Sequence, residues 1–355
     1  MLIKLNYIII FSLIAVLLSW ILYPVYIRIL KKLKVGKTIR EETATWEKSV
    51  IFTQLHKHKS WTPTMWWWMF LIIMLIMIWL SFALKEYWLI KNTLLNQKET
   101  YIILFWFFSM GLIWLVDDFL NVKWHSAIKW LSAKTKLIGM CLFSAFISRW
   151  FFSKLGIDYI NLWPIAGKVY LWLFYPIITF FVTISIVNAI NITDGLDWLA
   201  WWLTSMVLFV LAILTFLNQT YIATTVLAIL IAVLIAFMFF NINPAKIFMW
   251  DSGAFALWWF LASLLYLLNM RIWIFIPFIV LFWLFIIEVW SSALQIFWKK
   301  RFKRKLFPMS PLHHLFEHKG IPETTIVMKA WMIQWLLAAI TLIAIFYQIN
   351  TIGAQ

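Results

Sequence analysis

Long apolar runs constrain the fold of this chain more than any other feature of its sequence. Of its 355 residues, 65% are hydrophobic and only 12% are charged, whereas about 25% of the residues in soluble domains are charged. Each run is long enough to cross a hydrocarbon core of about 30 Å as an α-helix. We identify ten runs, at about 7–30, 66–84, 101–117, 136–152, 169–190, 198–217, 221–240, 253–270, 272–296 and 328–348. The sequence therefore predicts an all-α, polytopic membrane protein that forms one domain over residues 1–355.

The positive charge is distributed by loop. A net charge of +16 would indicate nucleic-acid binding in a soluble protein. Here, however, most Lys and Arg residues lie in loops that ten crossings would bring to one face, namely 31–65, 118–136, 191–197, 241–252 and 297–327. The positive-inside rule then predicts that these loops are cytoplasmic and that the N-terminus lies outside. Membrane lipid, and not nucleic acid, is the expected partner, and the run KKRFKRK at 299–305 is interpreted as an anchor to anionic lipid.

Acidic residues cluster in the same loops. The chain has only 14 Asp and Glu residues, and carboxylates at a membrane edge are candidates for function because they are costly to bury. Asp117 and Asp118 end the third run, where the helix dipole disfavours two anions; the alternative is a solvated helix end. Asn191, Asp194 and Asp197 are spaced by three in NITDGLD and fall loosely on one side of a helix, although a capping turn would also explain them.

The segment FNINPAKIFMWDSG at 240–253 combines amide and carboxylate groups. Asn241 lies where the seventh run ends, just before Pro244, which lacks the N–H that a continuing helix needs. Asp251 then precedes Ser252, Gly253 and the eighth run. An oxygen ligand at a helix N-terminus suits Mg²⁺ and phosphate together; a helix-capping Asp is the alternative.

Two basic motifs complete the candidate site. Lys59 and Thr64 precede the second run in a turn whose backbone N–H groups could approach phosphate. His313 and His314 lie in PLHHLFEHKG, and imidazoles can donate hydrogen bonds to phosphate or sugar. A zinc site is the alternative for the histidines, but the sequence has no HExxH motif and one cysteine only, which argues against it.

Tryptophan is unusually frequent and glycine unusually rare. The chain has 27 Trp and 9 Gly residues, whereas glycine is ordinarily about 7% of residues. Tryptophan interrupts the polar motifs themselves, as in TPTMWWWM, IWLVDD and FMWDSG. We interpret this pattern as a consequence of the codon UGA, which some bacterial lineages read as glycine and others as tryptophan. The alternative is a genuinely Trp-rich membrane protein, since Trp is common at bilayer interfaces.

With glycine read at those positions, the motifs resemble those of the polyprenyl-phosphate sugar-1-phosphate transferases. The resemblance covers about residues 36–333. Its motifs occur in order as TPTM at 62–65, VDDF at 116–119, NAINITDGLD at 188–197, NPAKIFMWDSG at 243–253 and PLHHLFEHKG at 311–320. The last motif is similar to the histidine loop of the muramoyl-pentapeptide branch. Leu315 stands where that loop has a third histidine, and Asn121 where the family has a lysine.

The resemblance implies an enzyme of the bacterial cytoplasmic (inner) membrane. It would use Mg²⁺ to transfer phospho-N-acetylmuramoyl-pentapeptide from its UDP-linked form, UDP-N-acetylmuramoyl-pentapeptide, to undecaprenyl phosphate, which gives lipid I and UMP in peptidoglycan biosynthesis. A homodimer is compatible with this reading. The alternatives are a sister transferase that acts on another UDP-N-acetylhexosamine and, in a different class, a transporter. Transporters place charges near the bilayer midplane, so acidic residues gathered at one face favour the enzyme.

The resemblance also implies roles for the candidate residues. The implied catalytic residues are Asp117, Asp118, Asp251 and His313. The implied Mg²⁺ ligands are Asp251 and Asn191. The implied substrate-binding residues are Lys59, Thr64, Lys134, Lys136, Asn191, Asp194, Asp197, Asn241 and His314.

Overall fold

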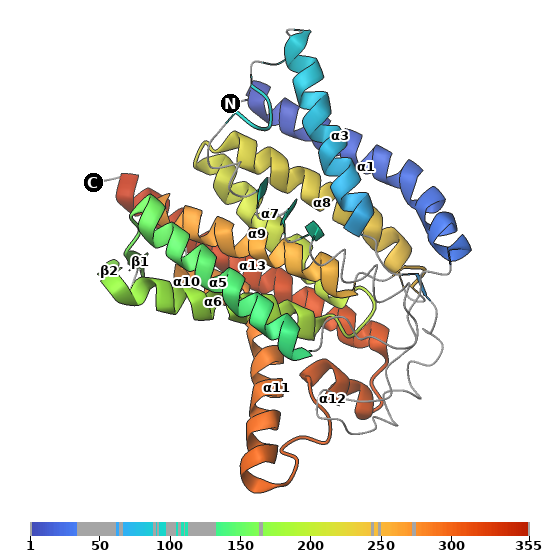
Figure 1. The fold of residues 1–355 in the computed structure, drawn as a ribbon, viewed down its shortest axis with the longest axis vertical. Helices are drawn as coiled ribbons and strands as arrows, with labels where there is room; N and C mark the ends of the chain where they lie inside the picture. The colour runs from blue at the N-terminus through green and yellow to red at the C-terminus, as the bar shows by residue number, and fades with distance from the viewer. Residues whose placement is uncertain are drawn as a thin grey trace.

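The computed structural model is a bundle of long helices (Figure 1). It describes residues 2–33, 62–63, 67–87, 90, 92–96, 104–105, 108–109, 111–112, 133–162, 166–242, 245–247, 250–271 and 275–353. The helices are α1 (Leu2–Lys32), α3 (Trp67–Glu86), α5 (Ala133–Leu155), α6 (Tyr175–Thr193), α7 (Leu199–Leu217), α8 (Tyr221–Asn241), α9 (Trp250–Arg271), α10 (Phe275–Leu281), α11 (Trp283–Phe302), α12 (Leu312–His318) and α13 (Glu323–Gly353). A short 3₁₀ turn, Trp172–Phe174, precedes α6.

Each predicted apolar run except 101–117 corresponds mainly to helix, although 169–190 begins in a short strand, and the run 101–117 lies largely outside the described residues. Within the described ranges, seven helices are long and apolar enough to cross a membrane, and the bent pair α10–α11 would make an eighth. The prediction of an all-α, polytopic membrane protein is confirmed. The number of ten crossings and the orientation of the N-terminus stay predictions.

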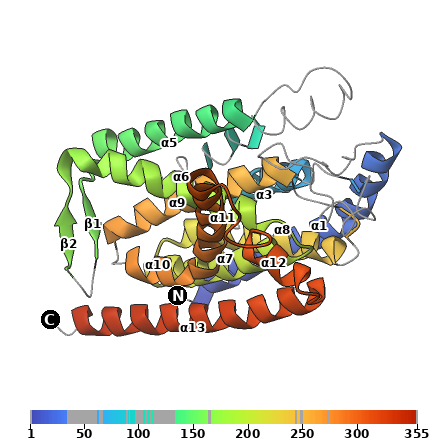
Figure 2. The same cartoon turned by 90° about the horizontal axis from the view of Figure 1, so that it is seen from below.

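Helices α7 and α8 form the centre of the bundle. Of their most apolar segments, 72% and 67% are buried inside the protein, compared with 28% for α1, α5 and α13. Figure 2 shows α5 and α13 on opposite outer sides, with α7 between them. The outer helices expose large apolar side chains such as Leu17, Leu142 and Ile343. In a bilayer this arrangement is favourable because lipid tails, and not water, cover the outer faces.

Helices α6 and α9 pack against each other in opposite directions. Thr183 Oγ1, near the middle of α6, lies 2.7 Å from Tyr266 Oη in the C-terminal half of α9. Beyond the N-terminal end of α6, the backbone N–H of Asn161 donates to Asn269 Oδ1 near the C-terminal end of α9, at 3.0 Å. The C-terminal end of α6 therefore lies toward the N-terminal end of α9. This pairing carries NITDGLD toward the segment that contains Asp251.

A small β-hairpin lies at the opposite end of the bundle from NITDGLD. Strands β1 (Tyr159–Asn161) and β2 (Lys168–Tyr170) are antiparallel, and Ile160 pairs with Val169. Asn269 fixes β1, because its Nδ2 donates to the carbonyl of Tyr159 at 3.2 Å and its own carbonyl accepts from Asn161 Nδ2 at 2.8 Å. This hairpin was not predicted, and β2 overlaps the first residues of the apolar run 169–190.

The run 272–296 was predicted as one continuous span, and this is wrong. The structure divides it into α10 and α11, which meet at a bend of 71°. The break frees backbone groups that must find partners in an apolar environment. Gln334 of α13 supplies one, because its Nε2 donates to the carbonyl of Leu281 at 2.9 Å.

We expect the end of α11 to face the cytoplasm. A cysteine placed at Arg304, in a Cys141→Ser background, should resist a membrane-impermeant thiol reagent added to intact cells, because the positive-inside rule places this cationic segment inside. A cysteine at Lys168, in the hairpin at the other end of the bundle, is the matched positive control. If Arg304→Cys is labelled from outside while Lys168→Cys is not, the predicted orientation is inverted.

Candidate active site

Four elements bring polar side chains together at one end of the bundle. They are the turn after α6, the end of α8, the short helix α12 and the start of α13. Helix α6 ends at Thr193, and the N–H of Asp194 donates to the carbonyl of Ile190 at 3.0 Å. Contacts among these elements show that the loops 191–197, 241–252 and 297–327 meet, as the sequence predicted for the polar loops.

The histidine pair packs against Gly195. A Cβ atom added to Gly195 would overlap Nε2 of His313 and lie 3.0 Å from Nε2 of His314. The centroids of the two imidazole rings are 4.2 Å apart, and the rings are arranged edge to face. Glycine is therefore required here because of the close approach of the rings. The contact joins NITDGLD to PLHHLFEHKG, which are far apart in the sequence.

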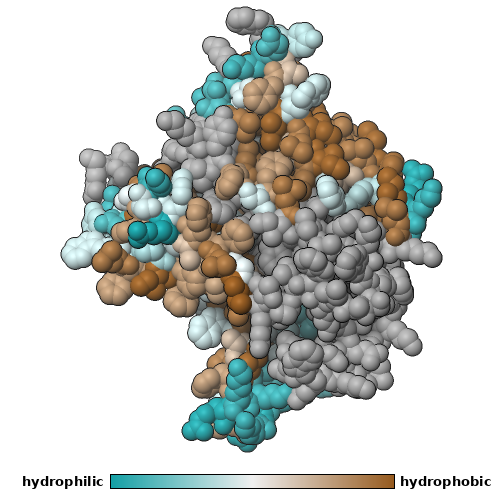
Figure 3. Space-filling model, viewed as in Figure 1, coloured by the Kyte–Doolittle hydropathy of each residue, from teal (hydrophilic) through white to brown (hydrophobic). Residues whose placement is uncertain are grey.

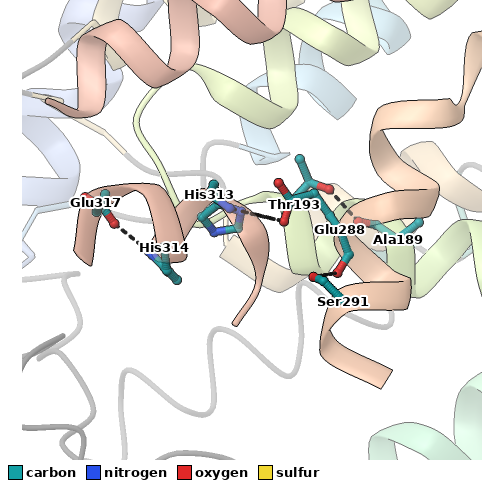
Figure 4. Close-up of polar contacts among 7 residues, drawn as sticks. All are labelled: Ala189, Thr193, Glu288, Ser291, His313, His314 and Glu317. Carbon is teal, nitrogen blue, oxygen red and sulfur yellow. Dashed lines mark hydrogen bonds and ion pairs between the residues drawn. The ribbon is translucent and has the colours of Figure 1, made fainter. Parts of the chain in front are cut away.

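A carboxylate from α11 orients His313 (Figure 4). His313 is 1% exposed, and its Nδ1 lies 3.1 Å from Glu288 Oε2. The same oxygen accepts the backbone N–H of His313 at 3.4 Å. Among the described residues, Nε2 of His313 has no hydrogen-bond partner. Glu288 thus holds the Nδ1 edge of the ring, and Nε2 is directed toward the NITDGLD turn.

His314 is oriented by its own helix. Its Nδ1 lies 2.6 Å from Glu317 Oε2, one turn further along α12. Helix α12 ends at His318, and Gly320, at φ 82°, turns the chain toward α13. The zinc alternative gains no support, since among the described residues no group of three His, Cys, Asp or Glu side chains is arranged to hold a metal ion.

The turn between α6 and α7 is held from two sides. The backbone N–H of Asp197, which is 4% exposed, donates to Glu323 Oε1 at 2.6 Å. The backbone N–H of Trp198 donates to Asn241 Oδ1 at 3.1 Å, and Asn241 Nδ2 donates to the carbonyl of Ile247 at 2.8 Å. Both ends of the Asn241 amide are thus used to join two loops, and a contact of Asn241 with substrate stays a prediction.

Trp198 adopts a backbone conformation that favours glycine. Its φ is 75°, in the left-handed region, which side chains with a Cβ atom disfavour. Its indole nonetheless has a place, because Nε1 donates to the carbonyl of Met238 at 2.6 Å and the ring contacts those of Trp202 and Trp331. The backbone agrees with the proposed glycine, whereas the packing accommodates the indole.

For several predicted site residues, the structure does not describe the side chain. Residues Lys59, Thr64, Asp117 and Asp118 are outside the described ranges. Lys134, Lys136 and Asp251 belong to described helices, but only their backbones are described. The structure brings together Asp194, Asp197, Asn241, His313 and His314, with Asn191 in the last turn of α6. Their roles in catalysis and binding stay predictions.

Three residues that organise the site were not among the predicted site residues, namely Glu288, Glu317 and Glu323. The available signal for Glu288 was a lone carboxylate inside an apolar run, which marks a functional candidate. Glu323 begins α13, where a helix N-terminus favours an anion, and this position leaves its carboxylate close to the Asp197 N–H.

Comparison with known proteins shows which families this chain is similar to. Residues 100–269 match the family described as Glycosyl transferase family 4. The chain is 31% identical to a phospho-N-acetylmuramoyl-pentapeptide-transferase of Staphylococcus carnosus, over 91% of this chain and 94% of that protein. It is 31% identical to the protein of the same name from Desulforamulus reducens, over 93% of each chain. It is 29% identical to that of Anoxybacillus flavithermus, over 91% of this chain and 93% of the relative.

Proposed function

Because the chain belongs to the phospho-N-acetylmuramoyl-pentapeptide-transferase family, we propose that it transfers phospho-N-acetylmuramoyl-pentapeptide from UDP to undecaprenyl phosphate. The products are lipid I and UMP, and the setting is the bacterial cytoplasmic membrane. The observation that carries the proposal is the contact between the histidine pair and Gly195, which joins the two most specific motifs of the resemblance. Helices of membrane-spanning length suit a reaction whose acceptor is a lipid.

In the proposed reaction, an oxygen of the lipid phosphate attacks the sugar-linked phosphorus. A bond forms between them, the bond from that phosphorus to the bridging oxygen breaks, and UMP leaves with the electron pair. Direct phosphoryl transfer needs positioning and neutralisation of charge more than a covalent intermediate. We assign Asp117 to receive the proton of the lipid phosphate and Asp118 to support it, which follows from the resemblance.

The donors near the end of α6 suit Mg²⁺, which prefers oxygen ligands and retains several waters. Asn191 offers an amide oxygen in the last turn of α6, and the antiparallel packing places the N-terminal turn of α9, with Asp251, toward the same end. We propose these two residues as the ligands. The ion would neutralise negative charge on the pyrophosphate.

The remaining residues would hold the substrates. Asp194 and Asp197 lie in the turn that contacts the histidines and would hold the nucleoside end. His313, with Nε2 directed toward this turn, and His314 would donate hydrogen bonds to phosphate or sugar. Lys59, Thr64, Lys134 and Lys136 would contact the phosphates, as the resemblance implies.

Substrate competition tests the proposal against the sister transferase. Purified protein, undecaprenyl phosphate and Mg²⁺ would be given UDP-N-acetylmuramoyl-pentapeptide and UDP-N-acetylglucosamine together, and the lipid products would be identified by mass spectrometry. We expect the muramoyl-pentapeptide product alone. A product that contains only N-acetylglucosamine would support the sister activity.

Gly195→Ala should sharply reduce transfer. The added Cβ would overlap the His313 ring, which Glu288 holds on its other side, and overpacking of this kind costs about 1–3 kcal/mol. We expect the rate to fall about tenfold or more while helix content is unchanged. Gly139→Ala is the matched control, because among the described residues no atom outside its own helix backbone and its chain neighbours lies within 4 Å of the added Cβ. Equal rates for the two variants would contradict the close contact at Gly195.

A further inference from the structure

Helix α11 leaves the bundle and ends in a cationic turn. The bend of 71° after α10 directs it away from the other helices, and Figure 1 shows it projecting beyond them. Its last turn and the segment that follows are KKRFKRK, at 299–305. The sequence contains no Asp or Glu between Glu288 and Glu317, so this stretch carries positive charge only. Figure 3 shows a hydrophilic surface at this projecting end.

The cationic turn has a fixed shape. Lys303 adopts a left-handed conformation, at φ 55°, and its N–H donates to the carbonyl of Lys299 at 3.0 Å. The chain then reverses, and the Gln295 side chain forms hydrogen bonds with the backbone of the segment that follows the turn. Its Oε1 accepts the N–H groups of Leu306 and Phe307 at 3.1 and 2.9 Å, and its Nε2 donates to the carbonyl of Phe307 at 2.9 Å. The exposed cations displayed on this turn are Lys300, Arg301, Lys303, Arg304 and Lys305.

An apolar stripe adjoins the cations along α11. Trp290, Leu294 and Phe297 are 60%, 42% and 62% exposed, and their spacing of four and three places them on one face of the helix. Phe302, which is 47% exposed, extends the apolar surface into the turn. The centroid of its ring lies 4.2 Å from that of the Trp298 ring. The opposite face is polar and buried, and its residues are Glu288, Ser291 and Gln295.

These features match a helix that lies in a membrane interface. Such helices bury an apolar face at the boundary between acyl chains and headgroups, while Lys and Arg side chains contact anionic lipid. Aromatic rings favour the same depth. We propose that the exposed cations Lys300, Arg301, Lys303, Arg304 and Lys305 bind the headgroups of anionic phospholipid, while the adjoining apolar stripe of α11 lies against the acyl chains. We call this surface the α11 tip, and its function does not depend on which sugar nucleotide the enzyme uses.

Lipid binding by matched variants tests the proposal. The tip variant carries K300Q, R301Q, K303Q, R304Q and K305Q, and the control variant removes five exposed cations elsewhere, as K31Q, K32Q, K85Q, R149Q and K154Q. Each full-length protein would be titrated with phosphatidylglycerol and phosphatidylcholine, and bound lipids would be counted by native mass spectrometry. We expect phosphatidylglycerol to bind the tip variant at least about tenfold more weakly than the wild type. The control variant should bind it almost as well as the wild type.

A depth measurement keeps the test independent of the fold of the tip variant. A nitroxide at Phe297→Cys, in the Cys141→Ser background with all tip cations present, would be reconstituted in bilayers with and without phosphatidylglycerol. We expect protection from a water-soluble relaxation agent that increases with phosphatidylglycerol and decreases with salt, because exposed charges are screened. The proposal is overturned if the label stays in water, or if the tip and control variants lose lipid equally. Selective binding of undecaprenyl phosphate or of an RNA oligonucleotide in place of phosphatidylglycerol would also overturn it.

Discussion

Replacing Asp251 by Asn should abolish transfer while the protein still folds and inserts. The substitution keeps the size of the side chain and removes the charge that we assign to Mg²⁺ binding. Loss of one preorganised electrostatic group commonly costs about 10²–10³ in rate, and we expect at least this loss. The initial rate of UMP release, measured over a Mg²⁺ titration, is the readout.

Asp158→Asn is the matched control for this variant. It is the same chemical change at the opposite end of the bundle, next to β1, and it should leave the rate near that of the wild type. If Asp251→Asn has wild-type activity at limiting Mg²⁺, the assignment of the metal is wrong. If both variants lose activity equally, the loss reflects general damage to the fold.

Restoring glycine at nine tryptophan positions should convert an inactive chain into an active one. We predict that UGA encodes Trp61, Trp66, Trp67, Trp114, Trp130, Trp198, Trp250, Trp258 and Trp259, and that the cell inserts glycine there. Trp331 should be an ordinary tryptophan codon. The reason is spatial, because glycine lets backbone approach phosphate and lets membrane helices pack closely.

The described residues give this prediction two physical supports. Trp198 has a φ of 75°, a conformation that glycine adopts without strain. Trp259 is 0% exposed, so its indole occupies space between packed helices that glycine would leave open for a closer approach. The packing of Trp198 against Trp331 shows that not every such ring is excluded by space alone.

Two measurements decide the matter of the tryptophans. The chain made as written and the chain with nine glycines would be compared for yield and transfer rate, and we expect only the second to be active, since overpacking costs about 1–3 kcal/mol per position. Mass spectrometry of the native peptide that spans residues 246–271 reports the amino acids directly. Tryptophan at positions 250, 258 and 259 would refute the prediction.

The sequence predicted well what depends on hydrophobicity and on motif order. The apolar runs predicted the long helices. The assignment of alternate loops to one face of the membrane predicted that NITDGLD, Asn241 and the histidine loop lie close together, and the structure confirms this. The break between α10 and α11 at Phe282 was missed because the run around it is apolar throughout. The carbonyl of Leu281, next to the break, accepts a hydrogen bond from Gln334 of α13, which is a contact between segments far apart in the sequence. The pairing of Glu288 with His313 was missed for the same reason, since a tertiary contact leaves no periodic pattern in the sequence.

Tracing the phosphorus of the donor tests the central claim most directly. UDP-N-acetylmuramoyl-pentapeptide labelled only at the phosphate next to the sugar would be incubated with the purified chain, Mg²⁺ and undecaprenyl phosphate, and the lipid and aqueous phases would be separated. Transfer of a phospho-sugar requires that the label enter the lipid and that the released UMP be unlabelled. Label recovered as UDP, with sugar joined to the lipid, would show that the sugar moves without its phosphate and would contradict the proposed reaction.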